Sequence, residues 1–187
     1  MTRPRILLSL LALFILSACV KPVIYEPDEV VSRAAYTSNE PPSITLVTVI
    51  NNSTGSGGHT ALVINASQRV IFDPAGNFKS RSVPEQNDLL YGITPAALST
   101  YYSFHARKQW HVVTQKIEVT PEVAEAVFQA AKNYGPVPDG FCAASTTKIL
   151  RSVPGFESIP QTFFPVRTMK AFAELPGVET NKIYEDD

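Results

Sequence analysis

Cysteine and histidine are scarce in this sequence, and its acidic and basic side chains nearly cancel. The 187 residues include two cysteines and three histidines and carry a formal net charge of −1. A near-neutral chain without a basic cluster gives no electrostatic basis for binding nucleic acid. No two histidines are four residues apart and no cysteine pair is available, so we expect no metal site. The loop NNSTGSGG lacks the P-loop lysine and the dinucleotide glycine spacing, and we expect no cofactor.

The first residues have the pattern of an export signal. Arg3 and Arg5 precede an apolar run over residues 6–16, which leads into the tetrapeptide LSAC that ends at Cys19. A basic start, an apolar run and a small-residue site are typical of a cleaved signal, and the run is too short to span a bilayer comfortably.

The tetrapeptide resembles the bacterial lipobox. The resemblance implies that residues 1–18 are removed as a lipoprotein signal peptide and that Cys19 becomes the lipidated, palmitate-bearing first residue. It also implies the periplasmic face of the outer membrane, because Val20 rather than aspartate follows the cysteine. The alternative is an ordinary signal in which Cys19 has no role.

The rest of the chain divides into a linker and one domain. Residues 19–42 contain four prolines without sustained periodicity, and we interpret them as a lipidated N-terminus and linker with a helical turn near residues 30–35. Residues 43–187 are long and apolar enough for one globular domain. We expect strands at 44–50, 60–64, 69–72 and 110–119, and helices at 94–102, 120–134, 143–153 and 166–175. This mixture predicts an α+β fold with a central antiparallel sheet packed against helices.

Cys142 is the only thiol left once Cys19 is lipidated. It follows a loop that ends in Gly140 and precedes a predicted helix, so it is expected at the N-terminus of that helix. Backbone amides and the helix dipole stabilise a thiolate there. The sequence therefore favours Cys142 as a nucleophile, and the alternative is a buried, inert cysteine.

His59 is the candidate base. It follows two glycines at the mouth of the predicted hairpin GGHTALVINASQRVIFDPAG, and Asp73 lies at the far end of the return strand. Pairing Ile64 with Gln68 places Asp73 opposite His59, whereas pairing Ile64 with Arg69 places it opposite Thr60 and turns it to the other face.

Two assignments stay open at this point. Asp73 begins the turn sequence Asp-Pro-Ala-Gly and has a purely structural alternative as a strand-end cap. His105 and His111 flank the strand at 110–119, and either is an alternative base.

The motif HTALVI in a strand and the motif FCAAS at a helix start, with histidine before cysteine, resemble the circularly permuted papain-like families. These include the NlpC-like proteins of the YiiX/YaeF type and the relatives of lecithin:retinol acyltransferase. The resemblance covers residues 44–153 and implies Cys142 as nucleophile, His59 as base and the return strand, with Asp73, as the source of a third catalytic group. Ala143 and Ala144 stand where these families usually carry polar or acidic residues.

Together these features predict an envelope-anchored, papain-like cysteine peptidase or related thiol hydrolase or acyltransferase. It would act on amide or ester bonds of a cell-wall peptide or a lipid-derived acyl substrate through a Cys–His acyl-enzyme. Its expected partners are the membrane, through the lipid anchor, and the peptide or acyl substrate. One alternative is a non-catalytic envelope lipoprotein that uses the same fold for binding or assembly, and another is an exported effector or its immunity-type partner.

Overall fold

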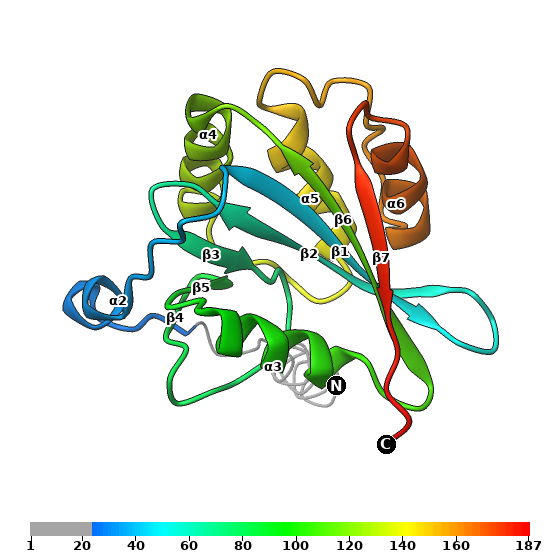
Figure 1. The fold of residues 1–187 in the computed structure, drawn as a ribbon, viewed down its shortest axis with the longest axis horizontal. Coiled ribbons are helices and arrows are strands. Elements are labelled where there is room, and N and C mark those ends of the chain that lie inside the picture. The colour runs from blue at the N-terminus through cyan, green and yellow to red at the C-terminus, as the bar shows by residue number, and fades with distance from the viewer. Residues whose placement is uncertain (1–23) are drawn as a thin grey trace, which may run out of the picture.

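Strand β1 (Ser43–Asn51) is the centre of the fold in the computed structural model, which describes residues 24–187. Its sequence is β-branched or apolar almost throughout, and all but the last of its nine residues are buried. Continuous burial of this kind requires a strand covered on both faces. Accordingly, β1 pairs with a strand on each side, and helices cover both faces of the sheet (Figure 1).

The sheet has seven strands in the order β4-β5-β3-β2-β1-β6-β7, and every neighbouring pair is antiparallel. The fold is therefore α+β with a central antiparallel sheet. The other strands are β2 (Gly57–Asn65), β3 (Arg69–Phe72), β4 (Glu85–Gln86), β5 (Leu89–Leu90), β6 (Trp110–Glu118) and β7 (Glu179–Ile183).

Five helices occur in the described part of the chain. They are α2 (Asp28–Ala34), α3 (Pro95–His105), α4 (Pro121–Lys132), α5 (Cys142–Arg151) and α6 (Pro165–Ala173). α4, α5 and α6 lie together on one side of the sheet, and α3 lies apart from them (Figure 1). α5 packs mainly on β2, and α6 packs on β1 and β2.

The buried apolar side chains form two clusters, and alternate residues of the central strands belong to different clusters. Leu46, Leu62 and Ile64 belong to the cluster that contains residues of α4, α5 and α6. Val47 and Ala61 belong to the second cluster, together with Tyr101 of α3 and other residues. Successive residues of a strand point to opposite faces, so each cluster marks one face of the sheet.

The segment before β1 packs against the domain instead of forming a free linker. Val31 of α2 is 7% exposed and belongs to the larger apolar cluster. The Asn65 side chain donates to the Glu40 and Pro41 carbonyls, and the Arg69 N–H donates to the Tyr36 carbonyl. Residues 24–42 therefore contribute to the folded unit that begins at Ser43 in the sequence prediction. The predicted signal peptide and Cys19 lie outside the described residues.

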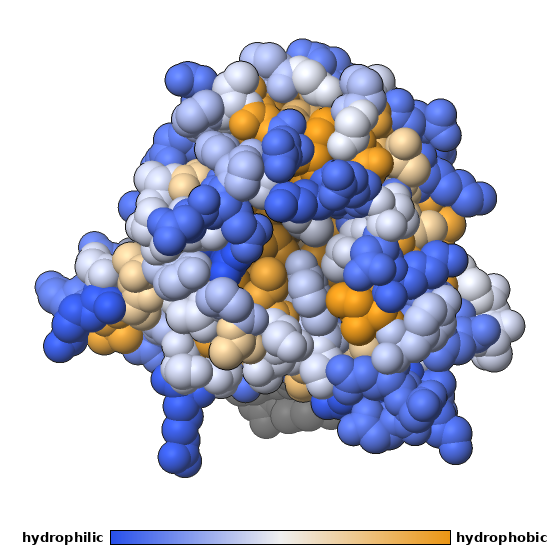
Figure 2. Space-filling view, viewed as in Figure 1, coloured by the Kyte–Doolittle hydropathy of each residue, from blue (hydrophilic) through white to orange (hydrophobic). Residues whose placement is uncertain are grey.

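The surface is mostly hydrophilic on the face shown in Figure 2, and hydrophobic residues gather in hollows near its centre. Among the helices of residues 24–187, none has both the length and the apolar character needed to cross a membrane.

Candidate active site

The short strand β3 leaves part of β2 without a neighbour on one side. β3 pairs with Leu62 to Asn65 of β2, and no described strand continues this pairing along residues 57–61. Beyond Phe72 the chain turns away, and the Asp73 N–H donates to the carbonyl of Asp88 (2.8 Å). This open stretch of the β2 edge is where side chains from both faces of the sheet can meet.

His59 is presented at this edge by a β-bulge. Val49 pairs with His59 and Ile50 pairs with Gly57, so Gly58 is the extra residue. Bulges re-aim side chains and are frequent next to functional sites. A Cβ atom at Gly58 would lie 2.6 Å from the ring of Trp110, so the close approach of the indole requires glycine there.

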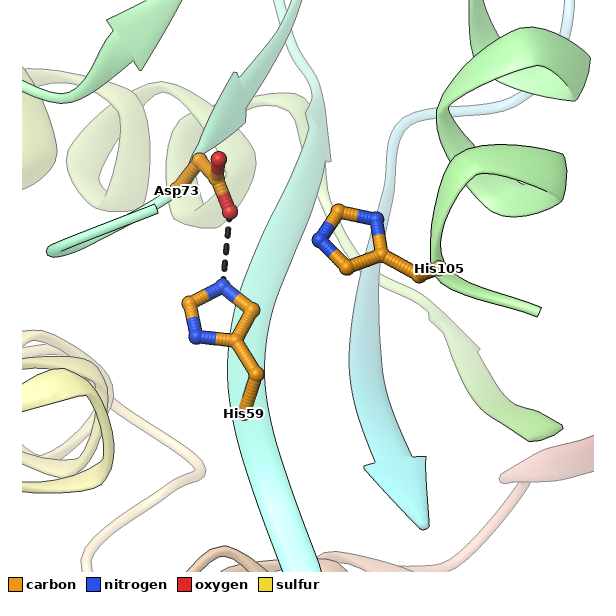
Figure 3. A group of neighbouring side chains, drawn as sticks. All are labelled: His59, Asp73 and His105. Atoms are coloured by element: carbon orange, nitrogen blue, oxygen red, sulfur yellow. Dashed lines mark hydrogen bonds and ion pairs between the residues drawn. The ribbon is translucent and has the colours of Figure 1, made fainter. Parts of the chain in front are cut away.

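Asp73 contacts His59 through a register that the sequence analysis did not include. Ile64 pairs with Val70, which places Ala61 opposite the position of Asp73. His59 and Ala61 are two residues apart and share a face, so Asp73 is the diagonal neighbour of His59. The Nε2 atom of His59 donates to Oδ1 of Asp73 at 2.7 Å (Figure 3).

The Asp73 carboxylate is buried and held from several sides. Its side chain is 2% exposed, and the Tyr101 hydroxyl donates to the same Oδ1 atom at 2.7 Å. A Cβ atom at Gly76 would lie 1.8 Å from Oδ2, so the turn can enclose the carboxylate only with glycine at that position. Burial acts to raise the pKa of Asp73, but the hydrogen bond and charge of His59 outweigh it and lower the pKa. Asp73 is therefore an acceptor in its ionised form.

His105 is the second imidazole of the site. Its ring stacks on that of His59 with centroids 5.6 Å apart and planes 8° from parallel. Its Nδ1 atom lies 2.9 Å from the carbonyl oxygen of Tyr101. Because a carbonyl only accepts, Nδ1 carries the proton and Nε2 holds the lone pair. Burial lowers the pKa of His105, which keeps this ring neutral.

Cys142 is the first residue of α5 and reaches the same edge from the opposite face of the sheet. It is 8% exposed. Burial acts to raise the pKa of the thiol, but hydrogen bonding to His59 and the charge of His59 outweigh burial, and backbone N–H groups of Thr60 and Ala143 add to them. The pKa of Cys142 is consequently lowered, as expected for a thiol at a helix N-terminus beside an imidazole.

His59 thus lies between an acid and a thiol. Asp73 occupies Nε2, and the other ring nitrogen, Nδ1, is on the side away from Asp73 and His105 and remains for Cys142 (Figure 3). Burial acts to lower the pKa of His59, but Asp73, with a smaller contribution from Cys142, raises it to about 10. A raised imidazole pKa and a lowered thiol pKa favour the imidazolium–thiolate pair.

A hollow of about 400 Å³ leads to this cluster from the His59 side. Its walls include His59, His105, Phe104 and Trp110. A larger hollow, about 780 Å³, lies between α2 and residues 79–85 and contains none of the clustered residues.

The structure brings together His59, Asp73 and Cys142 and leaves His111 apart. His111 contacts Asn52 through Nδ1 (2.7 Å) and stacks on the ring of Tyr184. The sequence analysis missed the part played by Tyr101. Its spacing of four residues from His105 was the available signal, because both residues lie on one face once the helix at 94–102 is extended to His105.

Neither the protein-family models, nor the curated proteins, nor the solved structures contain a match to this chain.

Proposed function

We propose that this protein is a thiol hydrolase or acyltransferase of the circularly permuted papain-like type, acting on amide or ester bonds through Cys142. The observation that carries the proposal is the placement of one imidazole. His59 is bound by a buried carboxylate at Nε2 and adjoins a thiol at a helix N-terminus on its other side. A nucleophile, a base and a group that orients the base are the arrangement of a catalytic triad.

The chemistry follows from these positions. The Cys142 thiolate adds to the substrate carbonyl carbon, and the π electrons move to the carbonyl oxygen. Backbone N–H groups in the first turn of α5 donate hydrogen bonds to this oxyanion. When the intermediate collapses, the bond to the amine or alcohol breaks, and His59 gives that leaving group its Nδ1 proton.

The thioester is then resolved by water or by another acyl acceptor. His59 takes the proton of the attacking group, the new acyl bond forms, and the electron pair of the breaking C–S bond returns to sulfur as the thiolate. Asp73 stays ionised throughout, holding the ring in the orientation that keeps Nδ1 toward sulfur.

Alkylation of Cys142 by iodoacetamide tests the proposal without a known substrate. The full chain in detergent, treated with a chelator, is compared with His59→Ala and with His111→Ala as the matched control. Labelling is quantified on the peptide that contains Cys142, which separates it from Cys19. We expect fast labelling below the ordinary thiol pKa of about 8.5, slowed in His59→Ala and unchanged in His111→Ala.

The burial of Cys142 favours one alternative, a non-catalytic binding lipoprotein. Slow labelling that is indifferent to His59 would support that alternative and contradict the enzyme.

The proposed location is the periplasmic face of the outer membrane, with the chain anchored through lipid on Cys19. Its support is the LSAC pattern in the sequence. Metabolic labelling with an alkyne analogue of palmitate is expected to mark the wild-type protein and to fail with Cys19→Ala. Equal labelling of the two proteins would contradict an anchor at Cys19.

A further inference from the structure

The polar cluster at the edge of β2 contains a second imidazole, His105, that the proposed catalytic triad does not use. His59, Asp73 and His105 each offer one nitrogen or oxygen atom, and these three atoms all lie within 4.8 Å of one another. They come from β2, from the residue that follows β3, and from the last residue of α3. Three separate elements therefore direct donors to one point.

The donors also point in the right direction. In Figure 3 the nearer ring nitrogen of His105 is turned toward His59 and Asp73, and Nε2 of His59 is turned toward the carboxylate. The hydrogen bond of His105 to the Tyr101 carbonyl fixes the proton on Nδ1 and leaves the lone pair on the converging Nε2 atom. A second ring nitrogen bound to a backbone carbonyl is the support that metal-bound histidines usually have.

We infer that His59, Asp73 and His105 form a binding site for one divalent transition-metal ion, with Zn²⁺ the best match to its donors. Two imidazoles and one carboxylate are a ligand set that Zn²⁺ uses in proteins, and three protein ligands leave a fourth position for water. In a tetrahedral site with bonds of about 2.0–2.1 Å the ligand atoms are about 3.3 Å apart. Nε2 of His59 and Oδ1 of Asp73, now 2.7 Å apart, must therefore separate slightly, and all three donor atoms already lie within 4.8 Å of one another.

The hollow beside the cluster supplies an entry path. Both imidazoles line it, and the one arginine or lysine among the described residues of its wall, Arg107, is paired with Glu185 (3.0 Å) and Asp187 (3.4 Å). An incoming cation therefore reaches the buried, ionised carboxylate of Asp73. The charge of this carboxylate is balanced by the proton that His59 carries.

Binding of the ion and the Asp73–His59 hydrogen bond exclude each other. The ion takes the lone pair of Nε2 that now holds a proton, and this proton leaves to solvent. The Nδ1 side, which faces the thiol, is not used. The metal site consequently does not need Cys142, and it does not depend on the proposed thiol chemistry.

Calorimetric titration with Zn²⁺ tests the site on the full chain in detergent, free of any histidine tag. We expect one ion per chain, with Cys142→Ala binding as the wild type does. His105→Ala is expected to weaken binding at least about tenfold, whereas the matched control His111→Ala leaves it unchanged. Co²⁺ bound to the wild type should give tetrahedral d–d bands without a thiolate charge-transfer band.

Three results would overturn the inference. These are no binding by the wild type, binding that disappears in Cys142→Ala, and binding that is unchanged in His105→Ala. If His105→Ala fails to fold, ¹⁵N chemical shifts of the imidazoles in the wild type decide the question. Zn²⁺ must then move the Nε2 signals of His59 and His105 and leave those of His111 in place. Loss of thiol activation with retained Zn²⁺ binding would contradict only the proposed function.

Discussion

Helices α4 and α5 begin in different ways. Thr120 is the N-cap of α4, with an extended backbone (φ −69°, ψ 155°) and a hydroxyl that accepts from the Val123 N–H, and Pro121 follows as the first helical residue. α5 begins after Phe141, which has no side-chain oxygen and a different backbone (φ −102°, ψ 9°). The N-cap residue of α5 therefore makes no side-chain hydrogen bond to the first amides of the helix.

The N-terminus of α4 stabilises its helix, whereas the N-terminus of α5 stabilises a reactive group. At α4 the free amides are satisfied by the usual Thr-Pro start, which stabilises the helix. At α5 the amide of Ala143 faces the thiol of Cys142 and lowers its pKa. A capping side chain there would occupy the position where the proposed oxyanion forms.

The largest expected effect comes from removing the thiol of Cys142 at the start of α5. Cys142→Ser keeps the shape of the side chain but replaces a thiol of lowered pKa with a hydroxyl that stays protonated. We expect hydrolysis of an activated ester, such as 4-nitrophenyl acetate, to fall by about 10³-fold or more. The rate is measured by absorbance and the acyl-enzyme by intact mass. Full activity in this variant would show that another residue is the nucleophile.

Asp73→Asn is expected to have the next largest effect. It removes the charge that raises the pKa of His59, so this pKa falls, and the pKa of Cys142 rises with the loss of the imidazolium. Wild-type alkylation is lost only as the pH falls through the lowered thiol pKa, and in the variant the loss begins at higher pH. At pH 7 we expect a rate decrease of about 10- to 100-fold. A pH profile that matches the wild type would separate Asp73 from the thiol.

Gly76→Ala is expected to act on the same carboxylate indirectly. The new Cβ atom would overlap Oδ2 of Asp73, so the carboxylate must move from His59 or the turn must open. We expect slower alkylation at pH 7 and a free energy of unfolding reduced by about 1–3 kcal/mol. Asn77→Ala, at the exposed neighbouring position, is the control and should change neither quantity. Equal behaviour of the two variants would show that Gly76 does not hold Asp73.

Removing the cap of α4 and adding a capping residue to α5 are expected to have the smallest effects. Thr120→Ala should reduce the free energy of unfolding by about 1 kcal/mol, because the Val123 amide loses its acceptor. Phe141→Thr should not gain the same amount, since a cap needs an extended backbone that position 141 does not have. Urea denaturation measures both. A gain near 1 kcal/mol at Phe141→Thr would show that the α5 start is uncapped only through its residue type.

The main strands and helices follow from residues near one another in sequence. Continuous apolar content predicts β1, and the Thr-Pro pairs predict the starts of α3 and α4. β7 was not predicted, because its sequence ETNKI is exposed and has no apolar alternation. Neither were the two-residue strands β4 and β5, whose pairing depends on the tertiary fold.

The candidate site could be predicted only as a set of residue types. His59, Asp73 and Cys142 were selected by glycines, turns and a helix start, but their contacts depend on pairing over long sequence distances. The hairpin register was missed because moving a three-residue turn by one position, from 65–67 to 66–68, shifts the pairing by two residues and leaves the apolar pattern on the same faces. The role of Tyr101 depends on where α3 packs, which no local pattern specifies.

The open stretch of β2 has a consequence for the folding of the protein. His59 and Cys142 are far apart in the sequence, and they meet only after β1, β2 and β3 have paired and α5 has docked on β2. Contacts of high sequence separation form at a high cost in loop entropy, and partial unfolding breaks them readily. The fraction of protein whose Cys142 reacts rapidly therefore measures the fraction that is natively folded. A preparation in which α5 is misdocked would keep its helices, but Cys142 would not be activated.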